Sequence, residues 1–188
     1  GKYVSILGTS GIGKTTLLRA ISGFKRITSG YIRINGQLAS SGFSHMPPEN
    51  RNLGFVFQDY ALFPHLNVFE NVGFGLGRKV KDRKIKIQSI IEMIDLKNHE
   101  KKYPNQLSGG QQQRVAIGRA LAINPSAILM DEPFSNLDFS LKSILSNEVK
   151  KIIRNTGTTT IMVTHDEREA ERLSDECYLL ENGKIRKI

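Results

Sequence analysis

Apolar residues fall into short continuous runs that alternate with longer segments in which they recur every three or four positions. The short runs predict strands at 3–7, 31–34, 53–57, 127–130, 159–164 and 177–180. The periodic segments predict helices at 14–22, 87–94, 111–122 and 141–153. Strands that are apolar along their whole length are usually buried on both faces. The pattern therefore predicts an α/β fold whose mostly parallel sheet is covered by helices on both faces.

The chain from 59 to 112 departs from this alternation. Residues 60–77 include Pro64 and three glycines, which predict a loop, and the next periodic segment predicts a helix instead of a strand. We therefore predict two parts. An α/β core is formed by residues 1–58 and 113–188, and an inserted α-helical lobe is formed by residues 59–112.

A phosphate-binding loop is expected between the first strand and the first helix. Its residues match the pattern G-x-x-x-x-G-K-[ST] and are Gly8, Thr9, Ser10, Gly11, Ile12, Gly13, Lys14 and Thr15. Such glycines let successive backbone N–H groups face one anion, and the helix N-terminus adds partial positive charge. Lys14 can then reach the β- and γ-phosphates, Thr15 can bind Mg²⁺, and Thr16 can contact the nucleotide nearer its α-phosphate. The loop predicts binding of a nucleoside triphosphate.

Two acidic residues directly follow the apolar run at 127–130. The carboxyl ends of parallel strands form the ligand-binding edge of such a sheet, so both side chains should face the phosphates. Asp131 would hold Mg²⁺ through its water shell, and Glu132 would polarise the attacking water. Many strands end in acids, so this pair becomes informative only together with the loop.

A third motif identifies a family. Leu107-Ser108-Gly109-Gly110-Gln111, followed by Gln112-Gln113-Arg114, resembles the signature sequence of the ATP-binding cassette (ABC) ATPases. Ser108 is also suited to cap a helix that begins near Gly110. Other motifs occur in the family's order. Gln58 closes a strand like the Q-loop glutamine, Ser135-Asn136-Leu137-Asp138 resembles the D-loop, and His165 follows a strand like the switch histidine.

The resemblance implies a P-loop ATPase that uses ATP and Mg²⁺ and works as a head-to-tail pair of subunits. Lys14, Glu132 and His165 would be catalytic, and Thr15, Gln58 and Asp131 would lie at the metal. Ser108, Gly109 and Gly110 would act on the γ-phosphate bound by the other subunit. Gln111 and Asp138 complete the residues that the resemblance places at the nucleotide.

Residues 57–66 and 69–72 are similar to the transport branch of the family, in particular to importers of ferric iron, polyamines, sulfate and sugars. Pro47-Pro48-Glu49 and the segment 134–138 favour ferric iron, with polyamine or sugar import as the alternative. The resemblance implies an integral membrane permease as partner, indirectly a solute-binding protein, and a peripheral location on the cytoplasmic face of the inner membrane. An exposed apolar and aromatic loop would bind the permease, with Tyr60, Leu62, Phe63 and Phe69 as candidate contacts.

Charge raises one competing class. The 188 residues carry a net charge of +9, and the excess lies in the first 102 residues. A basic surplus is also typical of proteins that bind nucleic acid. However, nucleic-acid-associated ABC ATPases carry coiled-coil insertions, zinc modules or a second cassette, and this sequence has none, so no nucleic-acid partner is expected. Single-cysteine usage and the lack of a long apolar run argue against a disulfide scaffold and a membrane span.

The chain begins at Gly1-Lys2-Tyr3, directly on the first strand. Members of the family usually have two further strands upstream, with an aromatic residue that stacks on adenine. We therefore expect a cassette that lacks these strands and also lacks the C-terminal regulatory domain of many importers. Tyr3 is too close to the phosphate loop to contact adenine and is expected to pack within its strand.

Overall fold

The computed structural model describes residues 1–188 apart from 78, 136 and 138. Its main sheet has six strands in the order β4-β5-β6-β1-β7-β8. Neighbouring strands are parallel except for β7 and β8, which form an antiparallel hairpin. This confirms the predicted mostly parallel sheet. In sheet order, the strands are β4 (Leu53–Val56), β5 (Ala127–Asp131), β6 (Thr159–Thr164), β1 (Tyr3–Leu7), β7 (Glu176–Glu181) and β8 (Lys184–Lys187).

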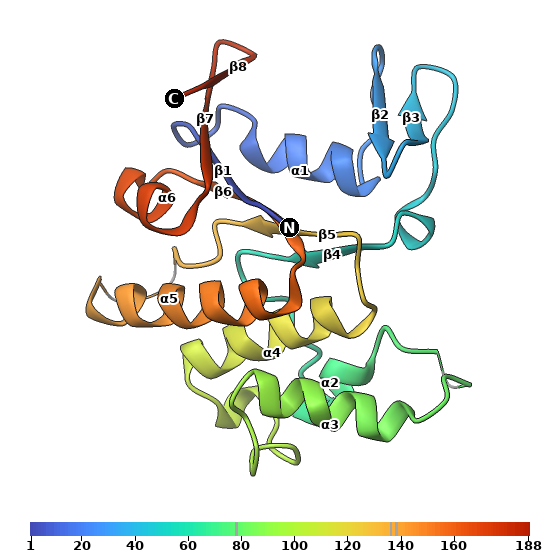
Figure 1. The fold of residues 1–188 in the computed structure, drawn as a ribbon, viewed down its shortest axis with the longest axis vertical. Coiled ribbons are helices and arrows are strands. Elements are labelled where there is room, and N and C mark those ends of the chain that lie inside the picture. Colours follow the sequence, from blue (N-terminus) through green and yellow to red (C-terminus); the bar gives the residue numbers. More distant parts are fainter. Residues whose placement is uncertain (78, 136, 138) are drawn as a thin grey trace.

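Helices cover both faces of this sheet (Figure 1). One face is covered by α1 (Lys14–Ser22), and the other by α4 (Gly109–Ala122), α5 (Phe139–Thr156) and α6 (Glu167–Leu173). Successive side chains of a strand point to opposite faces. In β5, Ile128 and Met130 therefore join the core under α4 and α5, whereas Leu129 joins the core under α1. This double burial explains the continuous apolar runs that predicted the strands.

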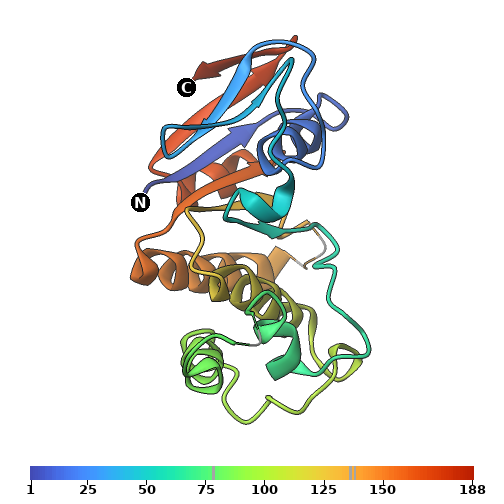
Figure 2. The same ribbon diagram turned by 90° about the vertical axis from the view of Figure 1, so that its right-hand side faces the viewer.

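Two further helices form a layer on the far side of α4 from the sheet (Figure 2). They are α2 (Val68–Gly73) and α3 (Arg83–Met93). The predicted apolar stripe of α3 is buried in this layer: Ile87, Ile90, Ile91 and Ile94. Because α4 packs on both β4 and this layer, it crosses the boundary we expected between residues 112 and 113. The division into core and lobe stays a prediction.

The expected loop at 60–77 contains α2, so that prediction was wrong for these six residues. Asn67 begins the helix, and its side chain accepts a hydrogen bond from the Glu70 N–H at 2.9 Å. The Glu70 carboxylate in turn accepts from the Asn67 N–H at 2.9 Å. Val68 and Val72, one turn apart, are buried where α2 packs on α3 and α4. Pro64 and the glycines obscured this short helix in the sequence.

Three other elements were also missed. A separate antiparallel hairpin pairs the predicted β2 (Tyr31–Ile34) with β3 (Gln37–Ser41), and the main sheet gains β8 after β7. Both β3 and β8 follow an Asn-Gly pair, at 35–36 and 182–183, in which both residues have positive φ. Such pairs favour tight hairpin turns, so they were the available signal. The third missed element is α6.

The expected packing of Tyr3 within its strand agrees with the structure. Tyr3 is buried in β1, with its hydroxyl directed at the sulfurs of Met130 and Met162. Two 3₁₀ turns lie at Pro48–Asn50 and Pro104–Gln106. Among the described residues, no helix is both long enough and apolar enough to cross a membrane.

Candidate active site

The predicted phosphate loop is the turn between β1 and α1. Gly11 and Gly13 have φ values of 80° and 109°, in the left-handed region that only glycine adopts freely. A side chain at Gly8 would approach Ile12 and the Leu180 carbonyl to 2.9 and 3.0 Å. Glycine at these positions therefore lets the chain reverse direction tightly and begin α1 at Lys14.

A cavity of about 340 Å³ lies over this turn. A second cavity, of about 600 Å³, shares Thr15 and Gln58 with the first and also contacts Asp131. The structure thus gathers predicted residues from three distant motifs around these two adjoining cavities. The first cavity is lined by Ser10, Gly11, Gly13, Lys14, Thr15, Thr16, Gln58 and Glu132.

Lys14 is almost fully buried at the base of the loop. Its ammonium donates hydrogen bonds to the carbonyl oxygens of Gly8 at 2.9 Å and Thr9 at 3.1 Å. The same ammonium lies 3.2 Å from Glu132 Oε1. These contacts hold the Lys14 charge between the phosphate loop and Glu132, which follows β5.

Thr15 and Asp131 meet beside Lys14. The Thr15 hydroxyl donates to Asp131 Oδ1 at 2.9 Å, which joins the start of α1 to the end of β5. Burial raises the pKa of Asp131, and the hydrogen bond from Thr15 opposes part of that rise. The pair presents oxygen donors, the kind that Mg²⁺ prefers.

Glu132 and His165 follow two neighbouring parallel strands, β5 and β6. Because Asp131 is in register with Val163, the ends of these strands lie side by side. Glu132 has a left-handed backbone with φ 44°, and its N–H donates to the Val163 carbonyl at 3.0 Å. Its Oε2 lies 2.9 Å from His165 Nδ1. The carboxylate therefore bridges the Lys14 ammonium and a half-exposed imidazole.

The signature residues at the start of α4 do not line either of these two cavities. Ser108 caps α4: its hydroxyl accepts from the Gln111 N–H at 3.3 Å, and Gln111 Oε1 accepts from the Ser108 N–H at 3.0 Å. A side chain at Gly110 would clash with Leu145 of α5 at 2.7 Å. Ser108, Gly109, Gly110 and Gln111 are not among the described residues that line the first cavity. Asp138 lies outside the described residues.

A separate apolar groove of about 320 Å³ runs beside β4. Of the four candidate permease contacts, Phe63 lines it, with its ring 4.1 Å from that of Phe74. Tyr60 is buried, so its expected exposure was wrong, whereas Leu62 and Phe69 are partly buried and pack against the core. The groove is lined by Leu53, Gly54, Phe55, Phe57, Ala61, Phe63, Phe74, Gly75, Arg119, Ala120 and Ile123.

Arg119 of α4 holds the segment that follows Gln58. Its guanidinium donates to the carbonyls of Tyr60 at 2.8 Å and Ala61 at 2.7 Å, and lies 5.3 Å from the centre of the Phe63 ring. Burial lowers the pKa of Arg119. Sequence patterns gave no sign of this role, because a basic residue near a helix C-terminus is ordinarily solvated. Sequence reasoning also missed Arg51 and Gln113, because their hydrogen-bond partners come from distant segments.

Comparison with known proteins identifies related sequences. A family described as ABC transporter matches residues 1–135. Over its whole length the chain is 47% identical to the spermidine/putrescine import ATP-binding protein PotA of Nitratidesulfovibrio vulgaris and covers 51% of that protein. It is 44% identical to the Fe(3+) ions import ATP-binding protein FbpC 2 of Haemophilus influenzae, covering 54%. It is 47% identical to the probable sulfate/thiosulfate import ATP-binding protein CysA of Chlorella vulgaris, covering 79%.

The chain thus spans about half the length of the first two relatives. A solved dimeric structure of the ATP-binding cassette MJ0796, in a post-hydrolysis state bound to ADP and phosphate, matches with a TM-score of 0.79 at 34% identity. That match covers 99% of this chain and 85% of the other. Sequence and fold agree, and the chain belongs to the ABC transporter family.

Proposed function

We propose that this chain binds and hydrolyses ATP as the ATPase subunit of an ABC importer. The observation that carries the proposal is the position of Glu132, 3.2 Å from Lys14 and 2.9 Å from His165 on the wall of the phosphate-loop cavity. A carboxylate placed there can accept a proton from water as it attacks the γ-phosphate. Membership of the family and the names of its relatives support the same function.

The phosphate loop, Lys14 and His165 each have a role in this hydrolysis. Backbone N–H groups of the loop and the start of α1 would bind the phosphates. Lys14 would neutralise the charge on the β- and γ-phosphates, which are stronger acceptors than the Gly8 and Thr9 carbonyls. His165 would hold the Glu132 carboxylate in place through Nδ1. Because phosphoryl transfer depends mainly on position and charge, these contacts would supply one subunit's share of the hydrolysis site.

The oxygen donors beside Lys14 fit a Mg²⁺ ion. Thr15 would bind it directly, and Asp131 and Gln58 would hold it through water. Bound there, the ion would neutralise charge on the β- and γ-phosphate oxygens. The hydrogen bond between Thr15 and Asp131 keeps the two donors at the same point of the cavity wall.

Asp131→Asn tests this assignment. The wild-type chain is expected to release phosphate from ATP in the presence of Mg²⁺, and EDTA is expected to stop the release. In the variant, a neutral amide replaces the carboxylate, so Mg²⁺ should bind about 10- to 100-fold more weakly and turnover should fall at limiting Mg²⁺. Phosphate release measured across a Mg²⁺ titration checks both. Superimposable titrations of variant and wild type would remove Asp131 from the metal site.

The same variant has a second expected effect, on stability. Burial raises the pKa of Asp131, so the folded chain disfavours its ionised form at neutral pH. Asp131→Asn should therefore raise the urea midpoint at pH 7 in EDTA. The gain should shrink as pH falls through the carboxyl's titration toward its unfolded pKa of about 4. Equal midpoints at pH 7 would contradict this.

The arrangement of the signature residues supports a head-to-tail pair of subunits. Ser108 and Gly109 are exposed at the start of α4, where backbone N–H groups can receive an anion from another molecule. We propose that Ser108, Gly109 and Gly110 contact the γ-phosphate held by the second subunit, with Gln111 beside them at the nucleotide. The solved relative is itself a dimer.

The groove beside β4 is the proposed site of the membrane permease. It lies where Arg119 fixes the segment after Gln58, so a partner in the groove would contact the segment that follows this residue of the nucleotide site. A solute-binding protein would join indirectly through that permease. The chain would then sit peripherally on the cytoplasmic face of the membrane.

Phe74→Glu is expected to reduce solute uptake by at least about tenfold, while MgATP turnover by the separate subunit changes less than about twofold. Phe74 is 57% exposed in the groove, so a charge there costs little stability but opposes an apolar partner. The matched control is Phe43→Glu, at a fully exposed phenylalanine on the loop after β3. Uptake and phosphate release are measured for both. Equal uptake by the two variants would exclude the groove as the docking site.

Ferric iron stays our prediction for the solute. The relatives' names divide among polyamines, ferric iron and sulfate, so they do not favour one solute over the others. Uptake of labelled Fe³⁺, spermidine and sulfate by cells with and without the gene would distinguish them. Loss of spermidine or sulfate uptake alone would overturn the iron prediction.

A further inference from the structure

The side chain of Gln113 is fully buried in α4, five positions after the capping residue Ser108. Its Nε2 donates a hydrogen bond of 3.0 Å to the carbonyl oxygen of Pro133. A carbonyl can only accept, so this partner fixes which end of the amide points toward it. Pro133 directly follows Glu132. The contact therefore joins the signature helix to the residue beside the base of the same subunit.

The turn that carries Glu132 needs outside support. Its φ of 44° is unfavourable for a residue with a side chain, and such conformations persist only where neighbouring contacts impose them. On one side, the Ser135 N–H and hydroxyl donate to the Glu132 carbonyl at 3.2 and 2.9 Å. Pro133 has no N–H, so its carbonyl is its one backbone hydrogen-bonding group. Gln113 supplies the hydrogen bond to that carbonyl.

The oxygen of the Gln113 amide lowers the stability of the fold. Gln113 Oε1 is buried and accepts no hydrogen bond from the described residues. Burying an unpaired polar atom costs about 1–3 kcal/mol, whereas an apolar side chain of similar shape would avoid that cost. Stability alone would therefore favour methionine or leucine at this position. What the amide provides in return is the hydrogen bond to Pro133.

We propose that Gln113 is a positioning residue that holds Glu132 in its catalytic orientation through Pro133. The inference rests on the proposed function, in which Glu132 activates water. Because Gln113 belongs to the helix that begins at Ser108, movement of that helix is transmitted to the base. A subunit that engages the partner's nucleotide at Ser108 would thereby adjust its own Glu132.

Gln113→Met is the first test. Methionine has a similar volume but no donor. Turnover of ATP is expected to fall at least about tenfold, as for loss of part of a general base's contribution. The affinity for a fluorescent ATP analogue should stay within about twofold, and the urea midpoint should be unchanged or higher. Amide hydrogen exchange at Glu132 and Ser135 should be faster than in the wild type.

Gln113→Glu provides a second readout that a purely structural role would not move. Its carboxyl group can donate to Pro133 only while it is protonated, and burial favours the protonated form. Turnover relative to the wild type should therefore rise as pH falls. A ratio that stays well below one at every pH would overturn the inference.

Asn71→Leu is the matched control. Asn71 is another fully buried amide, and it donates to the carbonyls of Phe63, Leu66 and Asn67 at 3.1, 2.8 and 3.1 Å. These contacts lie in the lobe, away from Glu132. This variant should lose stability but keep the turnover of the folded protein.

The outcomes separate the two proposals. Unchanged turnover in Gln113→Met, with an active wild type, overturns the positioning role, and so does unchanged exchange at Glu132 and Ser135. A large loss of stability in that variant would also overturn it. If the wild-type chain hydrolyses no ATP, the proposed function fails, and the exchange rates still decide whether Gln113 fixes the turn.

Discussion

Glu132→Gln is expected to lower ATP turnover by about 10²- to 10⁴-fold, which corresponds to roughly 3–5 kcal/mol of barrier, while ATP still binds. The amide has nearly the same shape as the carboxylate, and its oxygen can still accept from the Lys14 ammonium 3.2 Å away. It cannot accept a proton from water. The variant should therefore keep the site assembled, bind MgATP and accumulate as a closed dimer that does not proceed.

Three measurements check this expectation. Single-turnover phosphate release gives the chemical step, a fluorescent ATP titration gives the affinity, and size-exclusion chromatography with MgATP gives the dimer. The matched control is Glu167→Gln, an exposed carboxylate two residues after His165, which should change turnover less than about twofold. Unchanged turnover in Glu132→Gln would remove Glu132 from the role of base.

The phosphate loop and the acidic pair could be predicted because their signals are local. A Gly-rich turn that ends in Lys14-Thr15 specifies its own backbone, and Glu132 follows a strand whose burial is evident from its apolar run. The strand ends meet because parallel strands in one sheet must align their carboxyl ends. Spacing along the chain and the rules of sheet topology together were enough to place these residues.

The supporting contacts could not be predicted because they depend on which segments meet in space. In the sequence, Gln113 is one of three consecutive glutamines on a helix, which suggests a solvated face. In the structure, its side chain is buried because α4 packs between the sheet and the lobe. Tyr60 is a second residue whose surroundings the sequence did not reveal. An aromatic residue in a loop suggested an exposed contact, yet it is buried in the core.

Arg51 is a third residue of this kind, and it is central to stability. Its side chain is 2% exposed, and its guanidinium meets three segments. It donates to the carbonyls of Ala20 and Ile21 at 3.0 and 2.8 Å, at the C-terminal end of α1. A cation is favourable there because the last carbonyls of a helix carry partial negative charge. The space it occupies is open because Gly23 has no side chain: a Cβ at Gly23 would lie 2.6 Å from Nε of Arg51.

The other donors of Arg51 bind the hairpin and the segment that leads to β4. They reach the carbonyl of Ala39 at 3.2 Å, the hydroxyl of Ser40 at 2.5 Å and the carbonyl of Met46 at 2.8 Å. One side chain therefore joins acceptors of α1, β3 and the following loop; its contacts with β3 are buried, and the others are partly buried. No short apolar residue can replace this set of contacts.

Arg51→Met is expected to lower the free energy of unfolding by about 3–5 kcal/mol, because the hydrogen bonds that one buried guanidinium makes to three segments are lost at once. For a chain of this size, that corresponds to a fall in Tm of about 10 °C. Urea and thermal unfolding of the two proteins measure it. Arg51→Lys keeps the charge without the planar array of donors, so it should recover only a minor part of the loss.

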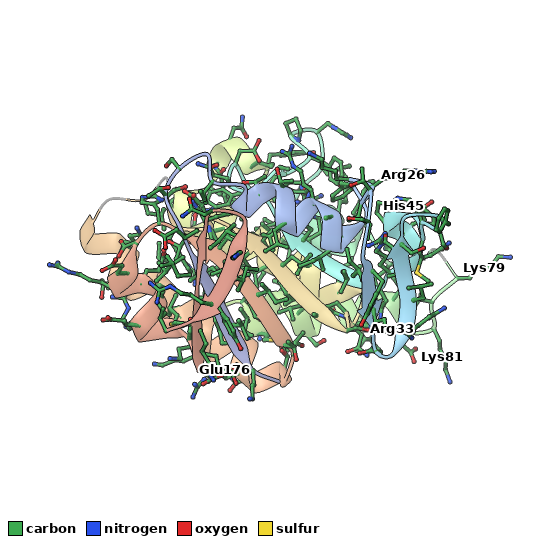
Figure 3. The ribbon with its side chains drawn as sticks, turned by 90° about the horizontal axis from the view of Figure 1, so that it is seen from above. Arg26, Arg33, His45, Lys79, Lys81 and Glu176 are labelled. Carbon is green, nitrogen blue, oxygen red and sulfur yellow. The ribbon has the colours of Figure 1, made fainter. Side chains whose placement is uncertain are left out.

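The matched control is Arg33→Met, at an exposed arginine on the β2–β3 hairpin near the edge of the molecule (Figure 3). Its guanidinium makes one exposed hydrogen bond, of 2.9 Å, to the Gly36 carbonyl, so the loss should stay within about 0.5 kcal/mol. If Arg51→Met were no more destabilising than Arg33→Met, the buried carbonyls would have to find other donors. The junction of α1 with the hairpin would then not depend on Arg51. If Arg51→Lys were as stable as the wild type, charge at the end of α1 would outweigh the hydrogen bonds to the hairpin.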